Sequence, residues 1–273
     1  MIRSLLRRPT LLIGLVVTLL LFAIAITSLF WTPLPPTKMQ IAQKLKPPFS
    51  AGLLGTDQFG RDLASMLMVG AWNSLSTSLL AVALGATLGT AVGVLVAAVR
   101  GLTEMVVMRV CDIIFAIPPI LSAMMLGAFI GSGRFTAIIA IAVFMVPVFA
   151  RLTLGAALQI WSREYVSAAI GMGRSRTRIT LVHILPNISN QIIVQVTIQL
   201  GLAILTEAGL SFLGLGMPPP APTWGRMLSD AQTFLGAAPW MALMPGLAIA
   251  LAVLGLNMLG DGLRDLLDPR DKT

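Results

Sequence analysis

The sequence predicts an all-α protein that crosses a membrane several times. Hydrophobic residues make up 56% of the 273 positions, charged residues make up only 11%, and the mean hydropathy is +0.89. Apolar runs of about 20 residues, long enough to cross a bilayer as a helix, recur along the whole chain. This composition excludes an ordinary soluble domain, and the single cysteine, Cys111, excludes an internal disulfide.

Six apolar runs define six expected transmembrane helices. The first run follows three arginines, as the apolar part of a cleaved signal peptide would. It is 20 residues long, however, which exceeds the usual apolar core of a signal, and no small-x-small cleavage site follows it. We therefore expect it to remain as the first span. The six spans cover approximately residues 11–30, 76–99, 106–131, 135–158, 188–214 and 240–260.

Lysine and arginine residues predict the orientation of these spans, because cytoplasmic loops are enriched in them. If the N-terminus is inside, the inner segments hold eleven such residues and the outer segments six, which places both termini and the loop 163–187 in the cytoplasm. The net charge of +8 does not indicate a nucleic-acid partner, since no basic face with interleaved aromatic residues is present. The inner residues are Arg3, Arg7, Arg8, Arg100, Arg163, Arg174, Arg176, Arg178, Arg264, Arg270 and Lys272, and the outer ones are Lys38, Lys44, Lys46, Arg61, Arg134 and Arg226.

The long outer segment, residues 31–73, begins with a proline-rich stretch that should be extended. Thr56 or Asp57 can then cap a helix whose apolar stripe, with Leu63 and Met66, suits the membrane surface. The string around Asp57 and Arg61 has two interpretations. It forms a hydrogen-bonded turn, or it contacts a delivered solute or its carrier.

Spacing along the second and third spans predicts two kinds of helix contact. Gly85, Gly89 and Gly93 are four residues apart, so they lie on one helix face and favour close packing of another helix over a smooth pore lining. Arg109 and Asp112 are three residues apart and can form an ion pair on the helix surface.

Prolines predict interruptions of two spans. Pro118 and Pro119 lie near the middle of the third span and must kink or break it, and Pro147 lies at a similar depth in the fourth. Broken helices are tolerated where their free carbonyl groups face protein or a wet cavity. The prolines therefore indicate a translocation path, with a bent packing helix as the alternative.

Glu207 is an ionisable residue inside the fifth apolar run, which makes it a candidate for function. It lies near the outer end of the run, where water or an arginine such as Arg226 or Arg61 can satisfy it. Two roles stay open for Glu207, a structural ion pair and a gate at the outer mouth.

The loop 163–187 is the longest interruption between apolar runs in the second half of the chain. We expect a helix over residues 163–170, a break at Gly171 and Gly173, and a second short helix over residues 175–184 that Pro186 ends. A basic helix–turn–helix between two spans suits docking against another protein. The only histidine, His183, is expected to form a hydrogen bond at a helix end.

Sequence motifs of enzymes are absent. There is no G-x-x-x-x-G-K-S/T loop for nucleotide phosphates, no H-E-x-x-H metal motif and no G-x-S-x-G nucleophile motif. We therefore expect no catalytic site, no metal site and no cofactor in this chain. If ATP drives its activity, ATP and Mg must bind another subunit.

Several strings resemble one protein family. Glu164, Ala168, Ala169 and Gly173, followed by I-L-P with Pro186, resemble the cytoplasmic EAA loop of permease subunits of bacterial ABC importers. The longer pattern, EYV-x-AA-x-x-x-G and R-I-x-x-x-H-I-L-P-N with Arg178 and His183, is similar to the branch that imports dipeptides, oligopeptides or nickel chelates. Ser167 departs from this pattern, since the family usually has glutamate there. Three further strings also resemble this branch: LGTD-x-x-GRD, EA-x-LSFLGLG with its P-x-WG continuation, and N-x-x-GD-x-LRD-x-x-DP-R.

This resemblance implies a type I ABC importer permease fold, with six spans, in the bacterial inner membrane. It implies a first helix and an outer proline-rich segment in residues 1–60, and a five-helix core in 61–273 with an ATPase-coupling loop at 159–187. The implied partners are a second, homologous permease in a heterodimer, two cytoplasmic ATPase subunits that hold ATP and Mg, an extracytoplasmic solute-binding protein and membrane lipid.

The implied solutes are short peptides or metal ions already bound by a chelator, such as nickel chelates. We expect the binding protein to supply most of the selectivity and the path to be lined by apolar side chains and freed carbonyl groups. The alternative is a self-sufficient channel or secondary transporter, which often has two related halves. No such repeat is seen in the sequence.

Overall fold

The computed structural model describes residues 9–267, and within this part the chain consists of helices and irregular loops without a β-strand. The arginines at positions 3, 7, 8 and 270, Lys272 and the end of the last motif lie outside the described residues. The helices are α2 (Pro9–Thr27), α3 (Leu63–Val99), α4 (Leu102–Ala116), α5 (Pro119–Ile130), α6 (Arg134–Trp161), α7 (Glu164–Gly171), α8 (Arg176–Ile179), α9 (Leu185–Phe212), α10 (Trp224–Ala231) and α11 (Trp240–Leu267), with a π-helical turn at Thr180–Ile184 and 3-10 turns at Ile41–Gln43 and Gln232–Phe234.

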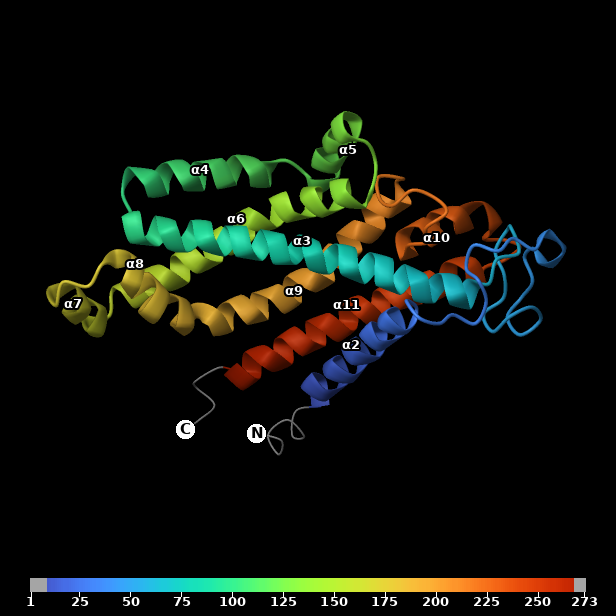
Figure 1. Cartoon of the computed structure of the whole chain (residues 1–273), viewed down its shortest axis with the longest axis horizontal. Coiled ribbons are helices and arrows are strands. Elements are labelled where there is room, and N and C mark those ends of the chain that lie inside the picture. The colour runs from blue at the N-terminus through green and yellow to red at the C-terminus, as the bar shows by residue number, and fades with distance from the viewer. Residues whose placement is uncertain (1–8, 268–273) are drawn as a thin grey trace.

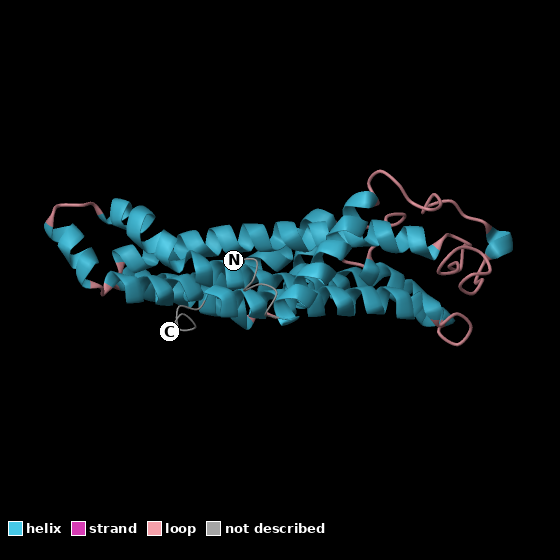
Figure 2. Cartoon of the chain, turned by 90° about the horizontal axis from the view of Figure 1, so that it is seen from below, coloured by secondary structure: helices cyan, strands magenta, loops and turns pink. Residues whose placement is uncertain are grey.

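The long helices form an elongated bundle (Figure 1). Helices α7 and α8 lie at one end of it, and the irregular segment before α3 lies at the other end (Figures 1 and 2). Five helices in the described residues are long and apolar enough to cross a membrane, and the number rises to six if α4 and α5 count as one bent span. The predicted all-helical, multi-span architecture is confirmed.

Helix α3 begins earlier than the sequence indicated. Its N-cap is Asp62, whose carboxylate accepts hydrogen bonds from the backbone N–H of Ser65 at 2.9 Å and from its hydroxyl at 2.6 Å. The prediction that Thr56 or Asp57 caps a separate surface helix is wrong. Leu63 and Met66 are buried in the core beside Trp224, so the apolar stripe is the first turn of a 37-residue helix.

The glycines of α3 form the predicted packing seam against α6. A Cβ atom at Gly85 would lie 2.4 Å from Cβ of Met145, and one at Gly89 would lie 2.5 Å from the carbonyl oxygen of Val146. Both distances are too short for any side chain, because real Cβ contacts stay above 3.0 Å. The packing interpretation of these glycines is therefore confirmed.

The two proline positions behave differently. At Pro118 and Pro119 the third span breaks, and α4 and α5 are bent by 86° relative to each other. The interruption predicted at Pro147 is wrong, since α6 runs without a break from Arg134 to Trp161 and buries Pro147 among its neighbours. The missing hydrogen bond is tolerated there because α3 packs closely along α6 and holds its backbone.

Helix α2 packs against α11 at the edge of the bundle. Gly14 approaches the backbone of α11 near Leu259, and Gly262 of α11 approaches Leu11. The first span is therefore attached to the last through small residues that let the two backbones come close. The division of the chain at residue 60 stays a prediction.

Candidate functional site

The segment 159–187, here called the 159–187 loop, forms the helix–turn–helix that the sequence predicted. Helix α7 ends in a Schellman motif: the N–H of Arg174 donates to the carbonyl of Ala169 at 3.1 Å, and that of Gly173 donates to Ile170 at 2.9 Å. Gly173 occupies the left-handed position of this motif, with φ of +76°. This is the conformation that glycine adopts without strain, so the expected turn at Gly173 is confirmed.

The inner face of the loop is fixed to the bundle. Val166, Ala169, Ile179 and Ile184 are buried in one apolar cluster with the ends of α3 and α6. Arg176 donates a hydrogen bond from its guanidinium group to the carbonyl of Ala98, in the last turn of α3. A cation at the C-terminal end of a helix also interacts favourably with the helix dipole. These contacts make the loop a rigid part of the fold.

The outer face of the loop exposes an apolar surface. Met172 at the tip is 72% exposed and Leu181 is 59% exposed, which is unusual for a segment between membrane spans that faces water. Exposed arginines surround these side chains. The exposed apolar residues are Tyr165, Ile170, Met172, Leu181 and Val182, and the exposed arginines are Arg163, Arg174, Arg176 and Arg178.

The residues that the sequence singled out in this loop divide between its two faces. Ala169 is buried and lets α7 lie close to the bundle, whereas its neighbour Ala168 is exposed. His183 is half-buried and contacts the ring of Tyr165 edge-on, with 6.1 Å between ring centroids. The remaining members, Glu164, Gly173, Arg178 and Pro186, are exposed.

The second helix of the loop does not end at Pro186, so that prediction is wrong. After α8 the chain makes a π-helical turn, in which the N–H of Leu185 donates to the carbonyl of Thr180, five residues back. This wider turn gives the ring of Pro186 room that a regular helix denies it. The side-chain amide of Asn187 then donates to the carbonyl of His183 at 2.6 Å. The loop is therefore continuous with the membrane helix α9, a connection that the sequence did not reveal.

At the other end of the bundle, Asp57 and Arg61 form a closed turn. The Asp57 carboxylate accepts from Nε of Arg61 at 2.6 Å and from the backbone N–H groups of Phe59 and Arg61 at 2.9 and 2.8 Å. Both side chains are buried, with residue exposures of 2% and 7%. The geometry is that of the hydrogen-bonded turn, which leaves little of either side chain for a solute.

Glu207 pairs with no arginine in residues 9–267. Its carboxylate is buried on α9 and accepts a hydrogen bond from the hydroxyl of Ser211 at 2.6 Å. The predicted partners are occupied elsewhere: Arg226 pairs with Asp230 at 3.2 Å, and Arg61 pairs with Asp57. In each case the carboxylate lies four residues from its arginine in the sequence, so local pairing prevails.

A tryptophan next to Glu207 holds α10 against the bundle. The backbone N–H of Trp224 donates to the hydroxyl of Ser74 at 3.2 Å, and its indole N–H donates to the carbonyl of Leu67 at 3.1 Å. A Cβ atom at Gly225 would lie 2.1 Å from the carbonyl oxygen of Ala208, directly after Glu207. The P-x-WG string is thus a close-packed junction between α10, α3 and α9.

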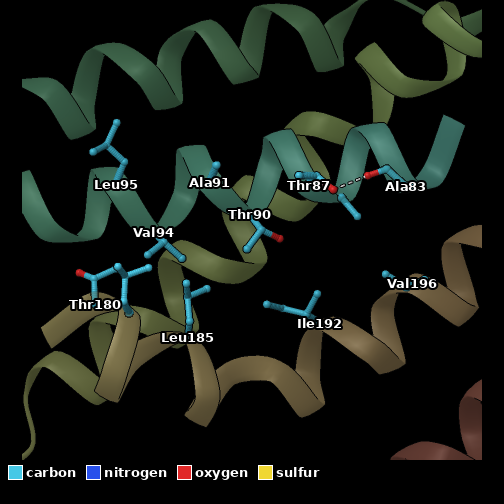
Figure 3. Close-up of a pocket in the computed structure, with 12 residues that line it drawn as sticks. Ala83, Thr87, Thr90, Ala91, Val94, Leu95, Thr180, Leu185, Ile192 and Val196 are labelled. Atoms are coloured by element: carbon cyan, nitrogen blue, oxygen red, sulfur yellow. Dashed lines mark hydrogen bonds between the residues drawn. The ribbon is translucent and has the colours of Figure 1, made fainter. Parts of the chain in front are cut away.

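Helix α9 presents two contrasting faces. Toward α3 it borders an apolar cavity of about 670 Å³, into which Leu185 and Ile192 extend (Figure 3). On its other side Asn190, Gln191 and Gln195 line a hollow of about 490 Å³ together with residues of α6 and α11. Side-chain amides are poorly suited to lipid, so this second face is the candidate wet surface within the spans.

An ion pair joins α4 to α6. Asp112 accepts a hydrogen bond from the guanidinium group of Arg151. The predicted pair of Arg109 with Asp112 is therefore wrong, because a partner 39 residues away in the sequence reaches the carboxylate instead.

Comparison with known proteins gives concordant results. Residues 89–272 match the family described as binding-protein-dependent transport system inner membrane components. The glutathione transport system permease protein GsiD of Pectobacterium atrosepticum is 42% identical over 226 residues, which cover 83% of this chain and 75% of that protein. The dipeptide transport system permease protein DppC of Alkalihalophilus pseudofirmus is 40% identical over 261 residues, which cover 96% of this chain and 86% of that protein.

Among solved structures, two crystal forms of the inward-facing MetNI methionine ABC transporter contain a similar chain. The TM-scores are 0.61 and 0.63, at 22% and 20% identity, and each match covers 74% of this chain and 96% of the other. At this identity the likeness establishes the fold.

Proposed function

The chain belongs to the family of inner membrane components of binding-protein-dependent transport systems, and from this premise we propose that it forms half of the path through which an ATP-driven importer carries short peptides. It is a multi-pass inner-membrane protein and a permease subunit of an ABC importer, with the permease fold of the type I class. The similarity to a dipeptide permease along 96% of the chain carries the proposal.

Short peptides are the solute class that the relatives favour. The two relatives are named for glutathione and for dipeptides. Both of these solutes are short peptides with free charged groups. For metal chelates, including nickel complexes, the motif resemblance is the only support as solutes. A peptide importer is therefore the first candidate, and a chelate importer the second.

The outer face of the 159–187 loop is the proposed contact with a cytoplasmic ATPase subunit. Its exposed apolar residues, with arginines around them, suit a short helix laid into a groove of another protein. Because the loop is continuous with α9, a movement of the ATPase would be passed directly to a membrane helix. ATP and Mg belong on that partner, and a solute-binding protein would dock at the opposite end, near the Asp57 turn.

A second permease subunit is proposed to complete the path. Helices α4 and α5 expose most of their large side chains, and the polar face of α9 lies open in the single chain. Lipid can cover the apolar surfaces, but it cannot satisfy the amide groups. A heterodimer with a similar permease would enclose this face, with lipid around the outside.

Mass measurement of the intact complex tests this composition. We expect one copy of this 28.9 kDa chain, one homologous permease and two ATPase subunits in the assembly extracted from its membrane. A control extraction in a strain that lacks the ATPase gene should leave the permease pair without catalytic subunits. A single copy of this chain that transports solute without an ATPase would support a channel or secondary transporter instead.

A further inference from the structure

Asp112 and Arg151 lie within helices that are candidate membrane spans. Asp112 is ten residues from the start of α4 and Arg151 is ten residues from the end of α6. Both helix ends lie at the end of the bundle that carries α7 and α8, which the sequence predicts to be cytoplasmic. At 1.5 Å per residue, each residue lies about 15 Å along its helix from that end, within a helix apolar enough to belong to a span.

The ion pair is open to its surroundings. The side chains of Arg151 and Asp112 keep relative exposures of 44% and 50%. Exposed charges at this depth cannot face lipid tails, which neither solvate a charge nor offer a hydrogen bond. The surface that carries the pair must therefore face water or another protein in the assembled transporter.

Aromatic rings hold the arginine in place. The ring of Phe115 lies 5.2 Å from the guanidinium carbon of Arg151 and stacks on the ring of Phe144, with 5.0 Å between centroids. A guanidinium group against an aromatic face keeps its hydrogen-bonding edge free. The pair is thus a fixed, preorganised charged site whose outward side is unoccupied by the rest of the described chain.

Helix α6 connects the ion pair with the amide-lined hollow beside α9. The next residue along α6, Leu152, lines the same hollow as Asn190, Gln191 and Gln195. Helix α6 thus carries the guanidinium group of Arg151 and, at the next position, a side chain of the amide-lined hollow. Charged and amide groups on packed helices within the spans suit a water-filled path and do not suit a lipid-facing surface.

We propose that the Asp112–Arg151 pair lies on the wall of the translocation path and contacts the charged groups of the passing solute. The site would take zwitterionic solutes, whose ammonium group binds the carboxylate while their carboxylate binds the guanidinium group. This inference rests on the proposed peptide-import function. It adds a charged site within the membrane to a path that the sequence predicted to be mainly apolar.

Opposite shifts in charge preference test the proposal in the reconstituted complex. Transport of alanyl-lysine and alanyl-glutamate is measured at saturating binding protein for the wild type, Arg151→Gln and Asp112→Asn. Loss of the guanidinium group leaves an unpaired carboxylate. Arg151→Gln should therefore raise the ratio of the alanyl-lysine transport rate to the alanyl-glutamate transport rate about tenfold. Asp112→Asn should lower the same ratio by about tenfold.

Two control variants and an assembly measurement complete the test. Arg100→Gln removes a positive charge at the end of α3, as Arg151→Gln does in α6, and Glu104→Gln removes a negative charge in the first turn of α4, as Asp112→Asn does further along. Both control variants should leave the ratio unchanged. An unchanged ratio in the two pair variants, or loss of the second permease from their complexes, overturns the proposal; the latter result would make the pair an assembly contact. If the wild-type complex transports neither peptide, the proposed peptide function fails first.

Discussion

Valine in place of Gly173 is expected to abolish solute transport while the chain still inserts into the membrane. Gly173 has φ of +76°, and a β-branched residue is strongly disfavoured in that region. The strain is on the order of 2 kcal/mol, about as large as the net contribution of the two hydrogen bonds of the Schellman motif together. The turn would rearrange and displace α8 from the position in which we propose that it meets the ATPase. Transport and ATP hydrolysis are measured together in reconstituted vesicles, and hydrolysis without transport is the expected result.

Gly171 provides a matched control for this variant. It lies two residues earlier, it is also exposed, and a Cβ atom at either position would meet nothing within 4 Å. Gly171, however, is the last residue of α7 and is not among the residues with positive φ. Gly171→Val should therefore retain transport. Normal transport by Gly173→Val would show that the geometry of the loop does not couple hydrolysis to movement.

A single methyl group at Gly93 is expected to destabilise the whole bundle. The Cβ atom of alanine at this position would lie 2.1 Å from Oγ1 of Thr153 and 2.4 Å from the carbonyl oxygen of Ala150. The threonine side chain can rotate, but the backbone carbonyl group cannot, so α3 and α6 must separate along their seam. We expect Gly93→Ala to lower the free energy of unfolding by about 3 kcal/mol, and the midpoint of thermal unfolding in detergent measures this change.

Gly209→Ala is the control for the seam. Gly209 lies in the last turn of α9, and a Cβ atom there meets nothing within 4 Å. The same substitution should stabilise the protein by a few tenths of a kcal/mol to about 1 kcal/mol, because alanine favours helix over glycine. Equal unfolding midpoints for the two variants would contradict the packing account of the α3 glycines.

Features that depend on one residue and its immediate neighbours were predictable from the sequence. The spacing of Gly85, Gly89 and Gly93 predicts a packing face because helix geometry alone places them together. The break at Pro118 and Pro119 follows from two adjacent prolines, and the turn at Gly173 follows from the conformational freedom of glycine.

Features that depend on tertiary contacts were not predictable. Pro147 and Pro186 have the same local chemistry as the prolines that break a helix, yet packing of α3 on α6 accommodates the first and a π-helical turn accommodates the second. Arg151 reaches Asp112 across 39 residues, which no local spacing indicates. Charge alone suggested Arg226 or Arg61 as a partner of Glu207. Each of these arginines instead pairs with a carboxylate that lies only four residues from it in the sequence.

Uptake of a labelled dipeptide into vesicles tests the central claim most directly. The vesicles would contain the complete complex, oriented with the 159–187 loop facing the compartment that holds ATP and Mg. We expect accumulation of the dipeptide away from the side of the binding protein, and its loss when either ATP or the binding protein is left out. Uptake by this chain alone, without ATP and without a binding protein, would contradict its assignment as the permease subunit of an ATP-driven importer.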